Sequence, residues 1–296
     1  MKSVIDCLEC TYRQALRAAR VATDDPAVHR RILDAVAQRL PGLSLDQSPA
    51  AMSMCAYELA AEISGNPDPY REMRNAQNAH ALALEPEMRA LLEASDDPLE
   101  TALHLSAAGN VIDLGTIKAE NIDVRAAVEQ ALHERFAMDH SHALRASLAT
   151  AQGILFLLDN AGEVVFDKLL IEQLQRFAPV TAVVKAGPIL NDVIREDAEQ
   201  VGLTEVCEVI DNGGAFIGSP LNLIPASFRA RMDAADVIIG KGQGNYETID
   251  DYPGDVFLIL KAKCDIVAAH MGVQYGQVGL ISTRVRAGLA PAAAQA

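Results

Sequence analysis

The sequence has no tryptophan, only 4% aromatic residues and no long uninterrupted apolar segment. No stretch approaches the roughly 18 to 20 uncharged apolar residues that a helix needs to cross a bilayer. The first ten residues, MKSVIDCLEC, place acids and cysteines where a signal peptide has its apolar segment. We therefore expect a cytoplasmic protein with no membrane partner.

Basic residues are scarce, with 25 Lys and Arg against 40 Asp and Glu and a net charge of -15. This charge repels a nucleic-acid backbone, and no run of Lys and Arg offsets it, so we expect no nucleic-acid partner. Small phosphorylated substrates are repelled as well. A phosphate site in this chain needs local positive charge from a metal ion, lysines or a helix N-terminus.

The five cysteines are too few and too scattered for a disulfide framework, and we expect reduced thiols. Only Cys7 and Cys10 are close in sequence, and a helix would put both on one face. Half of a zinc site, a redox pair and two packed small side chains all fit this spacing. We expect them to serve the assembly of the helical region, because phosphate chemistry uses harder ligands than thiolates.

Residues 1–150 read as a helical region. Four pairs of a capping residue and a proline are typical of helix starts; they are Asp25-Pro26, Ser48-Pro49, Asp68-Pro69 and Asp97-Pro98. Apolar residues recur at helical spacing between them, as in Val28, Ile32, Val36 and Leu40.

From residue 151 the pattern becomes one of short, β-branched apolar runs separated by helix-length segments. The runs are GILFLL (153–158), TAVVK (181–185), CEVI (207–210), DVIIG (236–240) and DVFLIL (255–260). This alternation predicts an α/β domain over 151–286 with a mostly parallel sheet covered on both faces. The alanine-rich residues 287–296 are predicted to be a disordered tail.

Ligands of such sheets bind beyond the carboxyl ends of the strands. Asp159 and Asn160 follow the first run directly, and Asp192 lies in the segment after the second. Carboxylate and amide oxygens suit Mg²⁺ or Mn²⁺, which keep open positions for substrate phosphate. Helix capping explains each aspartate singly, whereas the set favours a metal site with Asp159 and Asp192 as catalytic residues.

The segment GKGQGN (240–245) follows the fourth run, and it matches neither a Walker A loop nor a dinucleotide fingerprint. Its glycines, including Gly242, would let backbone N–H groups approach an anion, with Lys241 adding charge and Asn245 a hydrogen bond. A tight strand-to-helix turn explains the spacing equally well.

Lysines gather at the predicted strand ends. Lys261 and Lys263 would leave the same face of an extended strand, where two ammonium groups repel each other unless an anion lies between them. A solvated strand end is the alternative. Together with Lys185 and Lys241 they provide the positive charge that an acidic chain needs to bind phosphate.

These segments together resemble the damage-control phosphatase family, in particular its microbial branch with an N-terminal Cys-x-x-Cys. The segments that match are CLEC, GNVID, DNAGE, ND, KGQGN and KAKC, in that order over most of the chain. The resemblance implies a helical region packed on a Rossmann-like three-layer α/β/α domain. It also implies hydrolysis of phosphate monoesters of small metabolites with a divalent ion such as Mg, Mn, Co or Ni.

Transferred to this sequence, the resemblance implies that Asp159, Asn160 and Asp192 are metal ligands. Substrate-binding candidates are Asn110 in GNVID, Glu163 in DNAGE, Lys241, Gly242 and Asn245 in KGQGN, and Lys261 and Lys263 in KAKC. Lys263 matches the family's phosphate-contacting lysine better than Lys261 does. Both direct attack by water and a first step through an aspartyl-phosphate on Asp159 are compatible with these residues.

Two other functions fit the same fold. One is methyl transfer from S-adenosylmethionine, because the strand-end crevice also suits nucleotide-like cofactors. The other is a non-enzymatic protein that binds a metabolite or a metal. Phosphate release that depends on a metal would separate the phosphatase from both. The sequence does not indicate an oligomeric state.

Overall fold

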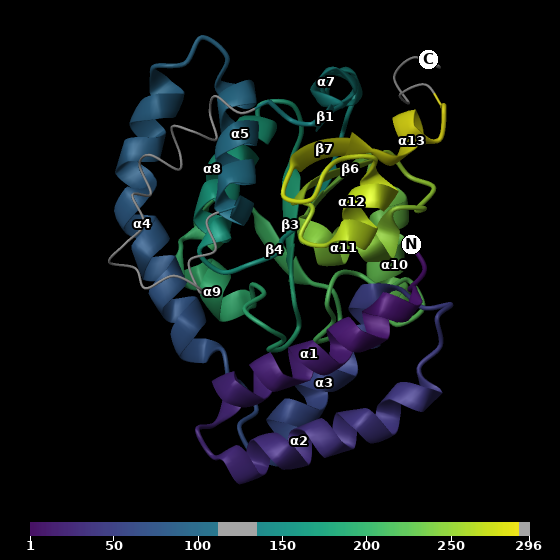
Figure 1. Ribbon diagram of the computed structural model, residues 1–296. Coiled ribbons are helices and arrows are strands. Elements are labelled where there is room, and N and C mark those ends of the chain that lie inside the picture. Colours follow the sequence, from purple (N-terminus) through teal and green to yellow (C-terminus); the bar gives the residue numbers. More distant parts are fainter. Residues whose placement is uncertain (112–134, 290–296) are drawn as a thin grey trace.

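The computed structural model describes residues 1–111 and 135–289, without the side chains of residues 110 and 111. A seven-stranded sheet forms its centre, with strand order β1-β7-β6-β5-β2-β3-β4 (Figure 1). All neighbouring strands are parallel except β6 and β7. The expected α/β fold with a mostly parallel sheet is confirmed.

Helices and strands alternate along most of the sheet domain. The strands are β1 (Met138–Asp139), β2 (Ile154–Leu157), β3 (Val180–Val184), β4 (Glu208–Asp211), β5 (Val237–Lys241), β6 (Val256–Lys261) and β7 (Val278–Ser282). The helices between and after them are α7 (Ser141–Leu148), α8 (Glu163–Leu174), α9 (Arg195–Gln200), α10 (Ala226–Ala234), α11 (Gly242–Ile249), α12 (Asp265–Met271) and α13 (Thr283–Arg286). All five strands expected from the apolar runs are present, and the sequence reading missed β1 and β7.

Each central strand buries both faces, because its alternate side chains enter two separate cores. In β2, Ile154 and Phe156 face one core, whereas Leu155 and Leu157 face the other. Helices α5 (Pro98–Val111) and α8 pack on the first face, and α10, α11 and α12 pack on the second. The result is the three-layer arrangement expected for apolar runs without polar alternation.

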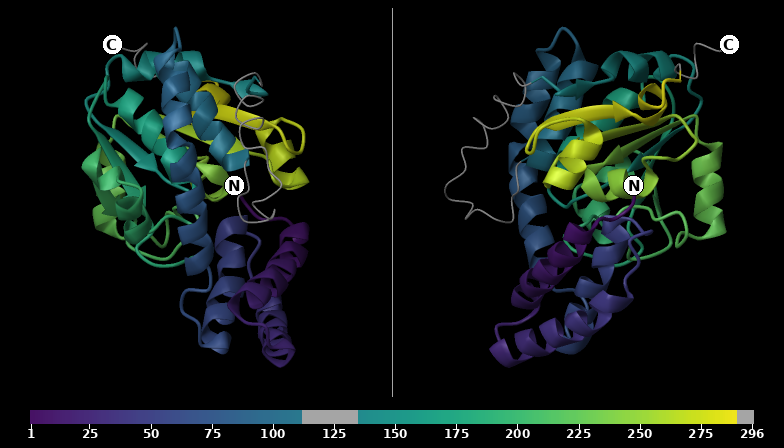
Figure 2. Two further views of the ribbon diagram at one scale, coloured as in Figure 1. Left: turned by 90° about the vertical axis from the view of Figure 1, so that its left-hand side faces the viewer. Right: turned by 45° about the vertical axis from the view of Figure 1, so that its right-hand side comes forward.

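A third core joins the first three helices into a unit of their own. Helices α1 (Ile5–Ala22), α2 (Pro26–Arg39) and α3 (Pro49–Ser64) pack around Ala15, Ile32 and Ala56. The same core includes Ile189, and Leu190 and Ile217 pack against it from loops that follow β3 and β4. This three-helix unit therefore lies at the carboxyl ends of the strands (Figure 2).

The remaining N-terminal helices belong to the sheet domain in space. Helix α4 (Arg71–Glu93) runs from the three-helix unit along α8, and α5 packs closely against α8. Gly109 of α5 allows this approach, because a Cβ there would lie 3.2 Å from Glu163 Cγ. The compositional change near residue 150 thus does not coincide with a boundary between cores.

Three of the four expected helix starts are confirmed. Asp25 caps α2 by accepting a hydrogen bond from the Ala27 N–H, and Ser48 caps α3 by accepting one from the Ala51 N–H. Helix α5 begins at Pro98, where Asp97 accepts from the Glu100 N–H. The fourth prediction is wrong, since α4 begins at Arg71 and the Asp68 carboxylate instead pairs with Arg74.

Within the described part of the chain, every helix is too short or too polar to cross a membrane. Residues 290–296 of the expected tail lie outside that part.

Candidate active site

The strand order reverses at β2, which lies between β3 and β5. Strands β2, β3 and β4 follow one another to one side, and the chain then returns to place β5 and β6 on the other. The order 4-3-2-5-6 is that of a doubly wound fold, whose ligands bind at the carboxyl ends where the order reverses. Asp159 and Asn160 follow β2 at this point, between the ends of β3 and β5.

Backbone hydrogen bonds bring Asp192 to the same place. Asn160 and Asp192 form an isolated antiparallel bridge. On either side of the bridge, the Val193 N–H donates to the Asp159 carbonyl at 2.9 Å and the Ala161 N–H donates to the Asn191 carbonyl at 2.8 Å. The structure thus brings together the three residues predicted as metal ligands, although 32 positions separate Asn160 from Asp192.

Asp192 is a buried carboxylate with one incompletely satisfied oxygen. Its Oδ2 makes no hydrogen bond to a described residue and lies 3.5 Å from the Lys185 ammonium group. Burial raises the pKa of Asp192 to about 8; Lys185 opposes this shift and Asp159 adds to it. A buried, unpaired carboxylate oxygen is costly unless a cation or a proton compensates it.

Asp159 and Asn160 are oriented by their neighbours. The Asn160 Nδ2 donates to Asp159 Oδ2 at 2.6 Å and to Glu163 Oε2 at 3.1 Å. A Cβ at Gly242 would come within 1.8 Å of Asp159 Oδ2, so only glycine allows α11 to begin here. Burial raises the pKa of Asp159 to about 6, the charge of Glu163 adds to this, and Lys263, Lys185 and Lys241 lower it.

The donor set fits a hard divalent cation. Two carboxylates and one amide oxygen are the ligands that Mg²⁺ and Mn²⁺ prefer, and burial leaves Asp192 Oδ2 to be compensated by a cation or a proton. Among the described residues no three His, Cys, Asp or Glu side chains converge on one point. That finding is compatible with this set, because its third donor is an asparagine.

Lys241 lies beneath the site and is completely buried. Its ammonium group donates to Glu163 Oε1 and Asp167 Oδ1, both at 2.6 Å, and to the Ser106 carbonyl at 2.9 Å. Burial opposes its charge, but the two carboxylates outweigh burial and raise the pKa of Lys241. With three partners for three N–H bonds, Lys241 is placed to support Glu163, and its predicted contact with substrate phosphate would require these bonds to break.

Asn245 is also buried, and its side chain joins two strands. Its Nδ2 donates to the carbonyls of Lys241 at 2.8 Å and Leu158 at 3.3 Å, and its Oδ1 accepts from the Ser219 hydroxyl. These bonds tie the end of β2 to the end of β5. The substrate contact expected of Asn245 stays a prediction.

The two C-terminal lysines differ in their position. Lys261 is the last residue of β6 and is half-buried, whereas Lys263 lies beyond the strand and is exposed. The Lys263 N–H donates to Gln243 Oε1, next to Gly242, and its charge lowers the pKa of Asp159. Lys263 is therefore the better candidate of the two for substrate contact, and this role stays a prediction. The side chain of Asn110 lies outside the described residues.

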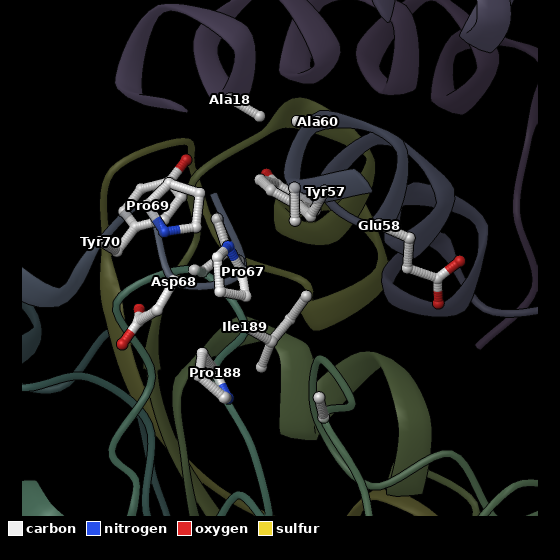
Figure 3. A pocket seen from close by; sticks show the side chains of 13 residues that line it. Ala18, Tyr57, Glu58, Ala60, Pro67, Asp68, Pro69, Tyr70, Pro188 and Ile189 are labelled. Atoms are coloured by element: carbon white, nitrogen blue, oxygen red, sulfur yellow. The ribbon is translucent and has the colours of Figure 1, made fainter. Parts of the chain in front are cut away.

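A small pocket of about 120 Å³ lies between the three-helix unit and the loop that leads to Asp192 (Figure 3). Tyr57 and Tyr70 line it from the helical side, and Pro188 and Ile189 line it from the loop. Leu190, in the same loop, has a φ of 48°, a left-handed value that a side chain disfavours. The three-helix unit thus holds the loop that carries Asp192.

Cys7 is buried on α1 and accepts a hydrogen bond from the Val4 N–H. Burial raises its pKa, the hydrogen bond from Val4 opposes this, and the charges of Glu247, Cys10 and Cys264 raise the pKa further. The neutral thiol is therefore favoured.

Several site residues were not predicted. Asp167, Ser106 and Gln243 were missed, and Lys185 was noted only as a charge at a strand end. The available signal for Asp167 is the start of α8, EVVFD, in which Glu163 and Asp167 lie one turn apart with three apolar residues between them.

The strand order defines a doubly wound α/β protein, with acidic residues gathered at the carboxyl ends of its central strands. Residues 3–278 match the model of the damage-control phosphatase ARMT1-like domain. The chain belongs to this family, and the names of its relatives support a role as a phosphatase.

Two archaeal relatives align with nearly the whole chain. A damage-control phosphatase of Pyrococcus horikoshii, PH1575, is 33% identical and aligns over 93% of this chain and 96% of its own. The uncharacterized protein MJ0202 of Methanocaldococcus jannaschii is 33% identical over 92% of each chain. A crystal structure of a DUF89 family protein from Pyrococcus horikoshii superposes with a TM-score of 0.89 at 32% identity, covering 96% of this chain and 99% of the other.

Proposed function

We propose that this protein is a divalent-metal-dependent phosphatase that hydrolyses phosphate monoesters of small metabolites. The observation that carries the proposal is the convergence of Asp159, Asn160 and Asp192 at the reversal point of the sheet, with Asp192 Oδ2 buried and without a hydrogen bond among the described residues. Asp159, Asn160 and Asp192 would hold the metal. When bound, the ion supplies positive charge that neutralises the phosphoryl oxygens.

The remaining residues divide the work of binding and orientation. Lys263 is exposed beyond the end of β6 and its charge lowers the pKa of Asp159, so we expect its ammonium group to bind a phosphoryl oxygen of the substrate. The Lys185 ammonium group, 3.5 Å from Asp192 Oδ2, partly balances the negative charge of Asp192. The backbone at Gly242 begins α11 against the Asp159 carboxylate, so the helix N-terminus adds a favourable field for an anion.

The experiment is phosphate release from a panel of phosphorylated metabolites with Mg²⁺, Mn²⁺, Co²⁺ or Ni²⁺, compared with protein treated with a chelator. We expect phosphate release to require the ion. In Lys263→Ala, turnover and substrate affinity should each fall about tenfold, which is the effect expected from the loss of one charge-assisted hydrogen bond. Lys261→Ala is the matched control and should change less. Equal rates with and without metal would contradict the proposal.

A further inference from the structure

A buried charged cluster connects α5, α8 and the end of β5 below the site. It consists of Ser106, Glu163, Asp167 and Lys241, of which none is more than 1% exposed. The Ser106 hydroxyl donates to Asp167 Oδ1 at 2.6 Å, the same oxygen that accepts from Lys241. The Lys241 ammonium group thus has a carboxylate on either side, and Asp167 is itself fixed by α5.

Stability alone does not account for this cluster. Desolvation of each buried ion costs several kcal/mol, and apolar side chains of similar volume often stabilise a core equally well or better. The neighbours of the cluster in α8 are Val164, Val165, Phe166 and Leu169, all buried in the first core. A lysine and two carboxyl groups within such a core require another explanation.

That explanation is the orientation of the Asn160 amide. Glu163 Oε1 accepts from Lys241, while Glu163 Oε2 accepts from Asn160 Nδ2. Because the Nδ2 group faces two carboxylates, those of Asp159 and Glu163, the Oδ1 atom must face away from both. Glu163 and Asp159 together therefore determine which atom of the amide is presented at the site.

The same lysine also controls the backbone beside Asp159. Lys241 is followed by Gly242, whose Cα lies directly against the Asp159 carboxylate. A shift of the Lys241 side chain would pull on this backbone and on Glu163 together. The first effect would reach Asp159 and the second would reach Asn160, to both of which we assign metal binding.

We propose that Asp167, fixed by Ser106, is a positioning residue that holds Lys241 and, through Glu163, orients Asn160 for metal binding. This inference rests on the proposed function only for the identity of the ligand. Without the Asp167 carboxylate, Glu163 alone balances Lys241, and its contact with Asn160 weakens. The loss of one negative charge near the site also disfavours a bound cation.

Asp167→Asn tests this, with Asp255→Asn as the matched control. Like Asp167, Asp255 is a buried carboxyl group that accepts a hydrogen bond from a buried serine, in this case Ser147. Unlike Asp167, it lies far from the candidate site, because it directly precedes β6 at the amino end of that strand. We expect Mn²⁺ to bind Asp167→Asn at least tenfold more weakly than wild type by titration calorimetry, in the 10- to 100-fold range typical of supporting residues (~1.4–3 kcal/mol). Asp255→Asn should bind it normally.

A second measurement does not depend on metal. The side-chain ¹⁵NH₂ resonance of Asn160, assigned with Asn160→Asp, should shift in Asp167→Asn and stay in place in Asp255→Asn. If Asp167→Asn does not fold, Ser106→Ala provides the milder change, with an expected two- to fivefold loss of Mn²⁺ affinity.

The outcomes are separable. Wild-type Mn²⁺ affinity in Asp167→Asn, an unchanged Asn160 resonance, or equal losses in both Asn variants would overturn the positioning role. Wild-type affinity in a folded Ser106→Ala, used where Asp167→Asn is unfolded, would overturn it as well. A wild-type protein that binds Mn²⁺ but releases no phosphate would refute the proposed function and leave the positioning role standing.

Discussion

Two buried lysines lie on either side of β2, and their surroundings differ. Lys241, at the end of β5, donates to two carboxylates and a carbonyl, all within 2.9 Å. Lys185, after β3, donates to the Gly218 carbonyl at 3.0 Å and lies 3.5 Å from an Asp192 oxygen that makes no hydrogen bond to a described residue. Lys241 thus has an internal partner for each of its N–H bonds, although Asp167 Oδ2 likewise makes no hydrogen bond to a described residue, whereas Lys185 borders the site to which we assign the metal.

Strand parity explains the difference. Lys241 continues the face of Val237 and Ile239, which belongs to the core under α5 and α8. Lys185 continues the face of Val183, which belongs to the core on the opposite side. Two lysines with the same position at a strand end therefore meet different partners, and the same residue type performs two tasks.

The largest effect is expected at the ligands of the metal. Asp159→Ala and Asp192→Ala should each lower turnover at least about a thousandfold, because a bound ion contributes several kcal/mol of transition-state stabilisation. Metal-free Asp192→Ala should melt no lower than wild type, since its buried carboxylate lacks full compensation. Steady-state kinetics and calorimetry check both, and wild-type turnover in either variant would refute the assignment.

Replacement of each lysine by methionine tests the comparison directly. Lys241→Met leaves Glu163 and Asp167 buried without their cation, so we expect a loss of about 3–5 kcal/mol in the free energy of unfolding. Lys185→Met should cost less stability and lower turnover about tenfold or more, because it removes charge beside Asp192. Denaturant unfolding and kinetics of both variants decide this, and the reverse pattern would contradict the division of tasks.

Glu247 extends the comparison to a buried carboxyl group that is not paired with either lysine. Burial raises its pKa to about 7, although Gln243 donates to it. The folded protein therefore binds this proton more tightly than the unfolded chain. The contribution of this proton to the free energy of unfolding is complete at low pH and is lost as pH rises from about 4.5 to about 7, by on the order of 3 kcal/mol.

Glu247→Gln should remove that part of the pH dependence. Thermal melts of metal-free wild type and variant between pH 4.5 and 8 measure it. The wild type should lose stability relative to the variant as pH rises, and parallel curves would show that Glu247 does not titrate as described.

The smallest effect on turnover is expected for the double variant Cys7→Ser and Cys10→Ser. The buried Cys7 contributes to packing of the first helix, so the variant should melt a few degrees lower, consistent with about 1 kcal/mol. Turnover per folded molecule should stay at the wild-type level, because thiolates prefer softer metals. An intact fold without hydrolysis would move the cysteine pair into the active site.

The sequence by itself determined the strands β2 to β6, the parallel sheet buried on both faces and the polar residues at its carboxyl edge. It did so because apolar runs bounded by helix-length segments have few alternatives, and because residues after parallel strands share one edge. For the same reason the sequence alone was enough to select Asp159, Asn160 and Lys263 as candidates.

Only the tertiary structure decided which of these residues meet. The bridge between Asn160 and Asp192 depends on the path of a loop that the three-helix unit holds through Ile189 and Leu190. The partners of Lys241 depend on α8 packing below β5, which no local pattern specifies. Side-chain contacts between distant segments follow from packing of the whole chain, whereas strands and caps follow from their own residues.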